Sequence, residues 1–537
     1  MDNQDLKKLK VTLVRNPIVF STGAQNNEAT PAIAYAYIGG YLRKKRYDVV
    51  IVDAIAEGLN KTWPLKKYPG FNCQGITFDE IISMIPKDSD VIAFSAMFSG
   101  EWPVLRDIII EVRKNFPDAL LVAGGEHTTA MSEYCLRDCP ALDVCVRGEG
   151  ERTFYRLLEV FEKTGSFKES DSISYLEKDG SYREIGNTLK SRILDIDTIP
   201  WPYWPKGYLE KFWAAGKSYG ISSERDMPFV FSRGCPYNCT FCSNSKMWTQ
   251  KYVMREIDDV INEIKYYIKQ YKITSLQLYD LTAILSKSWI IKMCQRLIEE
   301  DIKLKWSLPT GTRSEALDEE VLTLLKQTGC NYIVYAPESG SKKVLDMIKK
   351  RVNLNNLTKS ALTAKKLGMA CRINLIIGFP GEKWKDIFKT ILYGIKMAVR
   401  GIDEVPLYIY SPYPGSEMFD ELMKDGKIKL NDDYFFNMTS MNGNYFSFRK
   451  DPSYHPDIGA LKLRLVRITF ILLNYGIGYL LYPSRIVRTI KNLFSYNSTT
   501  VFEHRIKDLS KRIYHRLVFY RGPCERNSVA KEVEKNQ

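Results

Sequence analysis

Ser232-Arg233-Gly234-Cys235-Pro236-Tyr237-Asn238-Cys239-Thr240-Phe241-Cys242 places three cysteines on one short loop, with three residues between the first two and two between the last pair. The loop follows an apolar run, residues 227–231, that has the composition of a buried strand. Thiolates this close together can converge on one iron–sulfur cluster. Three ligands leave one iron open to bind something else. Structural zinc sites usually have four ligands and paired CxxC spacing, so the pattern favours a cluster over a zinc loop or three structural thiols.

The loop resembles that of the radical SAM superfamily, in which an aromatic residue also precedes the third cysteine, as Phe241 does here. The resemblance implies that Cys235, Cys239 and Cys242 are the catalytic and metal-binding residues and hold a 4Fe-4S cluster. It also implies that the open iron binds S-adenosylmethionine (SAM) and that the reduced cluster cleaves SAM to a 5′-deoxyadenosyl radical.

Composition indicates a soluble intracellular protein. The chain has 537 residues, which is long enough for two or three domains, and its 45% hydrophobic and 26% charged fractions are typical of globular proteins. Its first five residues are polar and unlike a secretory signal, so we expect its eleven cysteines to stay reduced in the cytoplasm.

The charge is unevenly distributed. The formal net charge is +14, and residues 484–537 alone carry twelve Lys or Arg against five Asp or Glu, which is half of the surplus. A local basic tail favours a local contact over a nucleic-acid-binding surface, so nucleic acid is not an expected partner.

Residues 1–160 predict a Rossmann-like domain with a doubly wound parallel sheet. Apolar strand-like runs at 10–14, 49–54, 90–95, 119–125 and 144–151 alternate with helical stretches, and this alternation is typical of such sheets. Ligands of these sheets bind beyond the carboxyl ends of the strands. The candidate ligand-binding residues there are Ser95, Met97, Phe98, Gly124, Gly125, His127, Gly148, Glu149 and Gly150.

This set resembles the cobalamin-binding domain fused to many radical SAM enzymes. Small residues would let the backbone approach a corrin ring. Neither a GxGxxG nor a GxxxxGK[ST] loop is present, which argues against dinucleotides and nucleoside triphosphates. A Rossmann-like domain with tight turns and no cobalamin remains the alternative.

The loop after the first strand departs from the methionine-synthase pattern, in which a histidine binds cobalt from below. Residues 15–23 contain no histidine, so the resemblance implies cobalamin without a lower-face imidazole. It would place Met97 and Phe98 beneath cobalt, with His127 at the periphery of the cofactor or capping the following helix. Cys135, Cys139 and Cys145 are expected to be free thiols because their spacing makes convergence on one metal awkward.

Residues 161–225 are predicted to be a linker that includes a hairpin at 172–183 and a proline- and aromatic-rich segment at 199–205. Residues 226–450 predict a partial (β/α)6 barrel. Its expected strands are 228–232, 274–279, 304–308, 331–336, 371–377 and 404–410.

Polar groups follow several of these strands and resemble the SAM-binding rim of the superfamily. The resemblance implies that Tyr279 and Asp280 meet the SAM amine and that Arg313 pairs with the SAM carboxylate or an acidic substrate. The turn 335–341, with Glu338 and Ser339, would reach the ribose. The loop 374–382 would cradle adenine through Ile376 and Gly378.

Residues 451–537 are predicted to form a helical, basic and apolar C-terminal region. The apolar run 468–482 has fifteen residues, fewer than the roughly 20 that span a bilayer, and cations flank it on both sides. An interfacial membrane helix, a lid on the barrel and a buried helical pair capping the barrel base all remain open.

The resemblance identifies a cobalamin-dependent branch that includes anaerobic magnesium-protoporphyrin monomethyl ester cyclase and many methyltransferases. It favours methylation of an unactivated carbon of a small, apolar or lipid-like substrate, with reduction by a donor such as flavodoxin or ferredoxin. The alternatives are radical cyclisation or rearrangement, and a membrane-associated redox or binding protein with a non-catalytic cluster. The location implied is the cytoplasm, peripheral to the inner membrane face if the tail contacts lipid.

Overall fold

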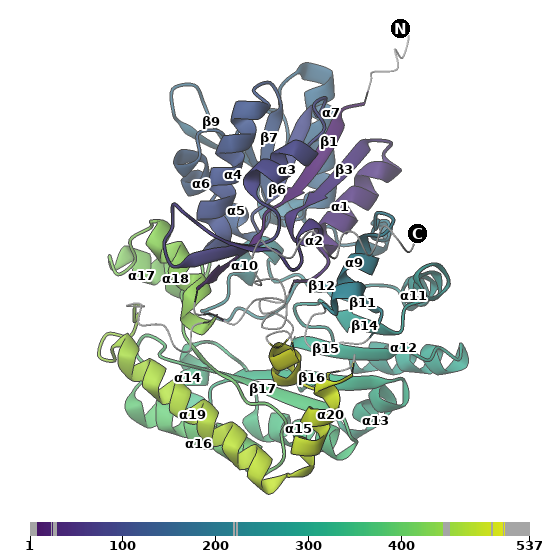
Figure 1. Cartoon of the computed structure of the whole chain (residues 1–537), viewed down its shortest axis with the longest axis vertical. Coiled ribbons are helices and arrows are strands. Elements are labelled where there is room, and N and C mark those ends of the chain that lie inside the picture. The colour runs from purple at the N-terminus through teal and green to yellow at the C-terminus, as the bar shows by residue number, and fades with distance from the viewer. Residues whose placement is uncertain are drawn as a thin grey trace, which may run out of the picture.

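Two α/β units and a C-terminal helical pair make up the molecule (Figure 1). The computed structural model describes residues 8–22, 24, 29–217, 221, 224–443, 452–495, 498–507 and 510, without side chains for 441–443. The last part of the predicted C-terminal region, 511–537, lies outside the described residues.

The first unit is a seven-stranded sheet of order β10-β9-β8-β7-β6-β1-β3. The five predicted strands all form and are parallel, which confirms the doubly wound sheet. The predicted hairpin also forms: β9 and β10 are antiparallel to each other, and β9 adds to the sheet antiparallel to β8. The bounds are β1 (Lys10–Arg15), β3 (Asp48–Asp53), β6 (Val91–Ser95), β7 (Leu120–Gly124), β8 (Val144–Val146), β9 (Ile173–Leu176) and β10 (Tyr182–Ile185).

Helices cover both faces of this sheet because successive strand residues point to opposite sides. Leu13 packs into a core with Leu42 and Leu157, whereas Val14 belongs to a core with Leu105. The helices are α1 (Ile33–Lys44), α2 (Ala54–Glu57), α3 (Phe78–Met84), η1 (Ser99–Glu101), α4 (Trp102–Asn115), α5 (Glu126–Ala130), α6 (Ser132–Asp138) and α7 (Gly150–Thr164). A small antiparallel sheet comprises β2 (Ile18–Ser21), β4 (Thr62–Pro64) and β5 (Phe71–Gln74).

The second unit is the predicted partial barrel. Its six strands are parallel and lie in sequence order, β11-β14-β15-β16-β17-β18. The strands are β11 (Asp226–Phe229), β14 (Ser275–Leu278), β15 (Lys305–Thr312), β16 (Cys330–Glu338), β17 (Ala370–Ile377) and β18 (Leu407–Ile409). The connecting helices are α11 (Ile257–Tyr271), α12 (Lys287–Glu299), α13 (Glu319–Gln327), α14 (Lys342–Met347), α15 (Leu354–Lys366) and α16 (Trp384–Val399).

Short elements connect the two units. α18 (Asp432–Gly443) follows the barrel but packs against the first unit (Figure 1), where Asp432 accepts two 2.9 Å hydrogen bonds from Arg106 and Phe436 stacks on Phe71. The other connecting elements are α8 (Thr188–Ser191), η2 (Ile196–Thr198), α9 (Tyr208–Ala215), β12 (Ser232–Arg233), α10 (Asn244–Trp248), β13 (Val253–Met254) and α17 (Glu417–Lys424).

The C-terminal region is helical, as predicted. α19 (Ala460–Leu481) is longer than the apolar run in the sequence. By length and composition alone it could cross a membrane, and only 28% of its most apolar window is buried in the protein. It lies along α16 on the outside of the barrel, with α20 (Ser484–Leu493) next to it (Figure 1). In the first unit, Cys135, Cys139 and Cys145 are buried free thiols, as expected.

Candidate functional site

The cysteine loop lies where the barrel faces the first unit. It leaves β12, which pairs with β13, through Gly234 at φ +88°, and a Cβ there would lie 2.0 Å from the Lys251 carbonyl oxygen. Cys235, Cys239 and Cys242 follow as half-buried free thiols. Glycine is therefore required at the entry to the loop.

Asp280 fastens the strand that leads into this loop. Its carboxylate accepts hydrogen bonds from the backbone N–H groups of Phe231 and Ser232 and from the Ser232 hydroxyl, at 2.6–3.1 Å. The side chain is 2% exposed, and burial raises its pKa to about 6. Asp280 is thus at the predicted rim, but its oxygens position the loop instead of pointing freely at a ligand.

Arg313, at the end of β15, is held close to the cysteine loop. Its guanidinium stacks 3.7 Å above the Tyr237 ring and binds Glu315 at 2.6 Å. Its Nη1 atom is buried and has no hydrogen-bond partner among the described residues. A buried guanidinium nitrogen without an acceptor fits a carboxylate ligand.

Glu338 ends β16 in a left-handed conformation, φ +69°, which is costly for a residue with a Cβ. Its carboxylate binds Lys350 at 3.0 Å, and both side chains are about one-tenth exposed. The Lys350 ammonium also lies 6.0 Å from the centre of the Phe241 ring. Lys350 therefore joins the cysteine loop to the predicted ribose-binding turn, a role that the sequence did not predict.

The remaining rim residues lie on two adjoining turns. Ser339 is fully buried, and its hydroxyl is within 2.8 Å of the Thr390 hydroxyl, so it holds the turn against α16. Ile376 is half-buried on β17, and Gly378 follows at φ +84°. Glu382 accepts hydrogen bonds from the N–H groups of Gly378 and Phe379, and burial raises the pKa of Glu382 to about 7.

The donor set of the loop fits a cluster. Among the described residues, no group of three or more His, Cys, Asp or Glu side chains lies close enough to hold a single metal ion. Three half-buried free thiols on one loop are the donors that an iron–sulfur cluster uses, since each of its cysteines binds a different iron.

A cavity of about 370 Å³ separates the cysteine loop from the carboxyl ends of the first sheet. Both units line it: Ser232, Arg233, Gly234, Tyr279 and Asp280 come from the barrel side, and Ser95, Met97, Phe98, Gly124, Gly125, Gly148, Glu149 and Gly150 come from the first unit. All but one of the residues predicted to bind a ligand on the first sheet thus line the same cavity.

The wall of the first unit combines glycines with positive φ and exposed apolar side chains. Gly125 has φ +111°, and a Cβ there would lie 2.9 Å from the Ala96 backbone, while Gly148 has φ +75°. Met97 and Phe98, which are 39% and 63% exposed, follow β6 as uncovered apolar side chains. The two glycines let the loops pack on the protein's own chain, and the uncovered Met97 and Phe98 leave apolar surface at the cavity that fits the corrin ring expected here.

His127 is the exception, because it does not line the cavity. It is 1% exposed, its Nδ1 lies 2.9 Å from the Ser99 hydroxyl, and its ring packs 5.3 Å from both Trp102 and Phe435. Burial lowers its pKa to about 3, so the ring is neutral. α18 covers His127 on the side of Phe435, and the contact of His127 with the cofactor periphery stays a prediction.

A buried ion cluster joins the two units beside the cavity. Arg233, next to the cysteine loop, binds Glu149 at 3.2 Å and Glu151 at 2.6 Å, and Arg192 binds Glu149 at 2.8 Å. All four side chains are less than 10% exposed. Glu149 lines the cavity as predicted, but its carboxylate is occupied by this cluster, and the side-chain roles of Arg192, Arg233 and Glu151 were not predicted.

The chain matches two family models. The radical SAM superfamily model matches residues 229–393, and the B12 binding domain model matches residues 24–158. An uncharacterised methyltransferase of Pyrococcus horikoshii is 28% identical over 77% of this chain and 83% of its own. Cytidylyl-2-hydroxyethylphosphonate methyltransferase of Streptomyces wedmorensis is 27% identical (79% and 83% covered), as is anaerobic magnesium-protoporphyrin IX monomethyl ester cyclase of Rubrivivax gelatinosus (76% and 69%).

Solved structures share the whole architecture. The radical SAM methyltransferase TsrM of Kitasatospora setae superposes with a TM-score of 0.61 at 14% identity, covering 78% of this chain and 76% of its own. The cobalamin-dependent radical SAM enzyme OxsB superposes with a TM-score of 0.60 at 18% identity, covering 96% and 72%. The fold is thus that of a cobalamin-binding unit joined to a radical SAM barrel. The chain therefore carries a radical SAM domain and a B12 binding domain, and the cofactors of these domains are a 4Fe-4S cluster, SAM and cobalamin.

Proposed function

We propose that this protein transfers a methyl group to an unactivated carbon of a small apolar substrate. One observation carries the proposal: the cavity between the units is lined by Ser232, Arg233 and Gly234, directly before the first cysteine, on one side and by the carboxyl ends of the first sheet on the other. A substrate held there would lie between the two proposed cofactor sites. Leu281, 39% exposed, and Val230 add apolar surface on the barrel side.

Each residue has a proposed task in holding the cofactors. Cys235, Cys239 and Cys242 would hold the cluster, and the unpaired Arg313 Nη1 would bind the SAM carboxylate. When bound, the cluster and SAM supply a radical and cobalamin supplies a methyl group.

The proposed ribose and corrin contacts follow the same logic. Glu338 would accept hydrogen bonds from the ribose hydroxyls after its ion pair with Lys350 breaks. The backbone at Gly378 would lie against adenine. Met97 and Phe98 would cover the lower face of the corrin ring and keep water away from cobalt. In such a reaction the protein mainly excludes water from the reacting groups.

The test is anaerobic reconstitution with iron, sulfide and hydroxocobalamin, followed by reduction in the presence of methyl-labelled SAM. We expect 5′-deoxyadenosine, label on the bound cobalamin and, with substrate, label in an apolar product. Absence of reductive SAM cleavage would favour a binding or redox protein instead.

Cyclisation or rearrangement is a second candidate, since a relative that is 27% identical is named a cyclase. It predicts 5′-deoxyadenosine together with a product that carries no label from the SAM methyl group. The same experiment therefore distinguishes the two reactions.

Radical SAM enzymes require a reductant and act on small molecules. We propose a donor of the flavodoxin or ferredoxin class and a cytoplasmic location, with the C-terminal helices at the inner face of the membrane. The buried free cysteines and the exposed leucines of α19 support this assignment.

A further inference from the structure

The helix α19 differs from an ordinary surface helix, because polar side chains lie among its buried residues while most of its leucines are exposed. Its buried residues include Arg467, Asn474 and Gly478. Six of its seven leucines point outward: Leu461, Leu465, Leu472, Leu473, Leu480 and Leu481 are 51–80% exposed, whereas Leu463 and Phe470 are buried. Helices that cover a soluble core bury their leucines and expose their cations.

Specific polar contacts hold the inward side. Arg467 Nε donates to the Leu407 carbonyl on β18 at 2.9 Å, and Asn474 donates to the Gly394 carbonyl on α16 at 3.3 Å. Arg485, at the start of α20, donates to the Gly401 and Ile402 carbonyls. Because these donors are fixed to the barrel, the six exposed leucines cannot rotate inward.

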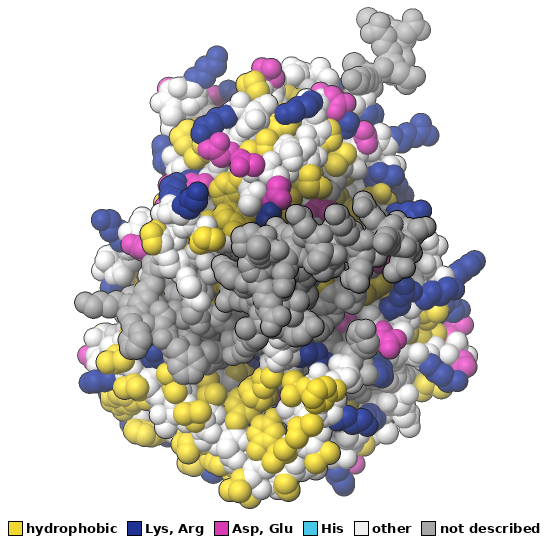
Figure 2. All heavy atoms as spheres, viewed as in Figure 1, with side chains coloured by type: hydrophobic (Ala, Val, Ile, Leu, Met, Phe, Trp, Pro, Cys, Tyr) yellow, Lys and Arg dark blue, Asp and Glu magenta, His cyan; other side chains and the backbone are white. Residues whose placement is uncertain are grey.

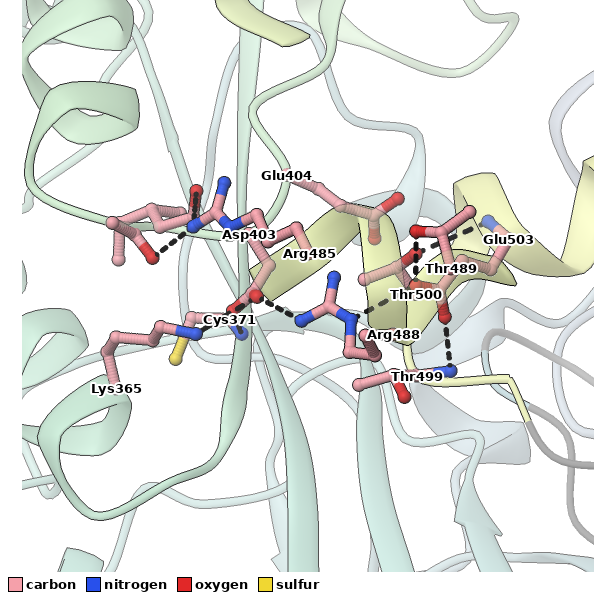
Figure 3. A network of polar contacts seen from close by, with 12 residues as sticks. Lys365, Cys371, Asp403, Glu404, Arg485, Arg488, Thr489, Thr499, Thr500 and Glu503 are labelled. Carbon is pink, nitrogen blue, oxygen red and sulfur yellow. Dashed lines mark hydrogen bonds and ion pairs between the residues drawn. The ribbon is translucent and has the colours of Figure 1, made fainter. Parts of the chain in front are cut away.

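Helix α20 repeats the arrangement. Arg488 binds Asp403 at 2.9 Å and Glu503 at 3.0 Å, and Lys365 also binds Asp403, as Figure 3 shows. Glu404 accepts from the backbone of the segment after α20. The outward residues are Ile486, Val487, Ile490 and, just after the helix, Phe494, which are 46–90% exposed.

Helix α16 extends the surface from the barrel itself. It packs along α19, and its Trp384, Phe388, Leu392 and Val399 are 39–62% exposed. We call the outward residues of α16, α19 and α20, with Phe494, the apolar face; Figure 2 shows apolar side chains gathered over these helices in the lower part of the view. It holds fourteen of the twenty-three large hydrophobic residues that are exposed in the described part of the chain, so they are not scattered.

The charge around the apolar face has one sign. Residues 460–493 contain no Asp or Glu and six Lys or Arg, of which Arg467, Arg485 and Arg488 are bound to the barrel side. Lys462 and Lys491 are exposed beside the leucines, and α16 adds the exposed Lys385, Lys389 and Lys396. A second copy of this chain would bring like charges together across a two-fold interface, whereas an anionic surface would neutralise them.

We propose that the apolar face docks on a bilayer containing anionic phospholipid, with α19 lying in the plane of the interface. The contacts of Arg467 and Asn474 with the barrel favour lying over spanning. The docked helix reaches the active site, because Leu463 lies 2.8 Å from the Cβ position of Gly378. The inference deepens the proposed function, since it would give an apolar substrate a source in the membrane, but its test needs no turnover.

The experiment is sedimentation of the full-length protein with vesicles of phosphatidylcholine, with or without phosphatidylglycerol. The wild type should bind the phosphatidylglycerol vesicles and bind less at high salt. Leu472→Glu/Val487→Glu should bind at least about tenfold more weakly. Leu194→Glu/Ile298→Glu, at positions 56% and 50% exposed on other elements, should bind like the wild type.

We expect Leu472→Glu/Val487→Glu to keep the wild-type melting temperature and the wild-type rate of reductive SAM cleavage. An unchanged melting temperature shows that the fold is intact, and unchanged cleavage shows that the proposed chemistry is intact, so weaker sedimentation then reports loss of docking alone. Wild-type protein that stays in solution with anionic vesicles would overturn the proposal, and so would equal binding by the face variant. A dimer that the face variant converts to a monomer would also overturn it, because a second copy would then cover the apolar face.

Discussion

Removing Arg233 should destabilise the protein by about 3–5 kcal/mol, because its charge lies in a buried ion cluster. Its guanidinium is 9% exposed and binds Glu149 and Glu151, whose side chains are 0% and 7% exposed. In Arg233→Met, Glu151 loses its cation and Glu149 keeps only Arg192. The cost is that of leaving buried charge uncompensated, which is larger than the net value of the ion pair itself.

The assay is the free energy of unfolding in a double-mutant cycle with Glu151→Gln. Each single change leaves one charge unpaired, so the double variant should be less destabilised than the sum by about 2 kcal/mol or more. Arg137→Met is the matched control, because Arg137 and Glu133 form an i,i+4 pair that is about half exposed; it should cost less than about 0.5 kcal/mol.

Because Arg233 directly precedes Gly234 and Cys235, Arg233→Met should also lower iron and cobalamin retention together. Additive energies in the cycle, or an Arg233→Met variant as stable as the Arg137→Met control, would refute the view that this cluster holds the two units in register.

Three further predictions concern single positions. Cys239→Ser should lose iron and reductive SAM cleavage, whereas the buried Cys145→Ser should keep both, as measured by iron analysis and 5′-deoxyadenosine yield. Burial raises the pKa of Glu382 to about 7, above about 4.3 in the unfolded chain, so its contribution to stability should fall as pH rises between these values. Glu382→Gln should therefore flatten that part of the profile of unfolding free energy against pH, and an unchanged slope would contradict it. Gly125→Ala should cost about 1–3 kcal/mol and release cobalamin on desalting, read by visible absorption, while Gly165→Ala, at φ +66° with nothing within 4 Å of its Cβ, should keep the cofactor.

The sequence was sufficient for the architecture because its signals are local. Each buried strand of both sheets is a short apolar run, and the cysteine spacing and the Gly124-Gly125 turn are readable within a few residues. Parallel order then follows from the alternation with helices. The cavity was also predictable, since carboxyl ends of parallel strands gather at one edge.

The functions of individual side chains were less predictable because their partners are distant in sequence. The sequence predicted that Asp280 binds SAM. In the structure its carboxylate oxygens accept hydrogen bonds from the backbone N–H groups of Phe231 and Ser232, which are 49 and 48 residues away in the chain. His127 looked accessible beside two glycines, yet a helix about 300 residues later, carrying Phe435, covers its ring. No local pattern distinguishes a carboxylate that binds a cofactor from one that fastens a loop.

The C-terminal region shows why composition alone left three alternatives open. A partial barrel ends in a strand with one unpaired edge, here β18, and exposed strand carbonyls require donors. Arg467 supplies one to Leu407, and Arg485 and Asn474 serve carbonyls nearby. Arg467 and Asn474 face the barrel beside Leu463 and Phe470, so the other six leucines of α19 face away from it. The exposed leucines are therefore a consequence of closing an open barrel, and the apolar surface that this leaves outside is what a membrane would cover.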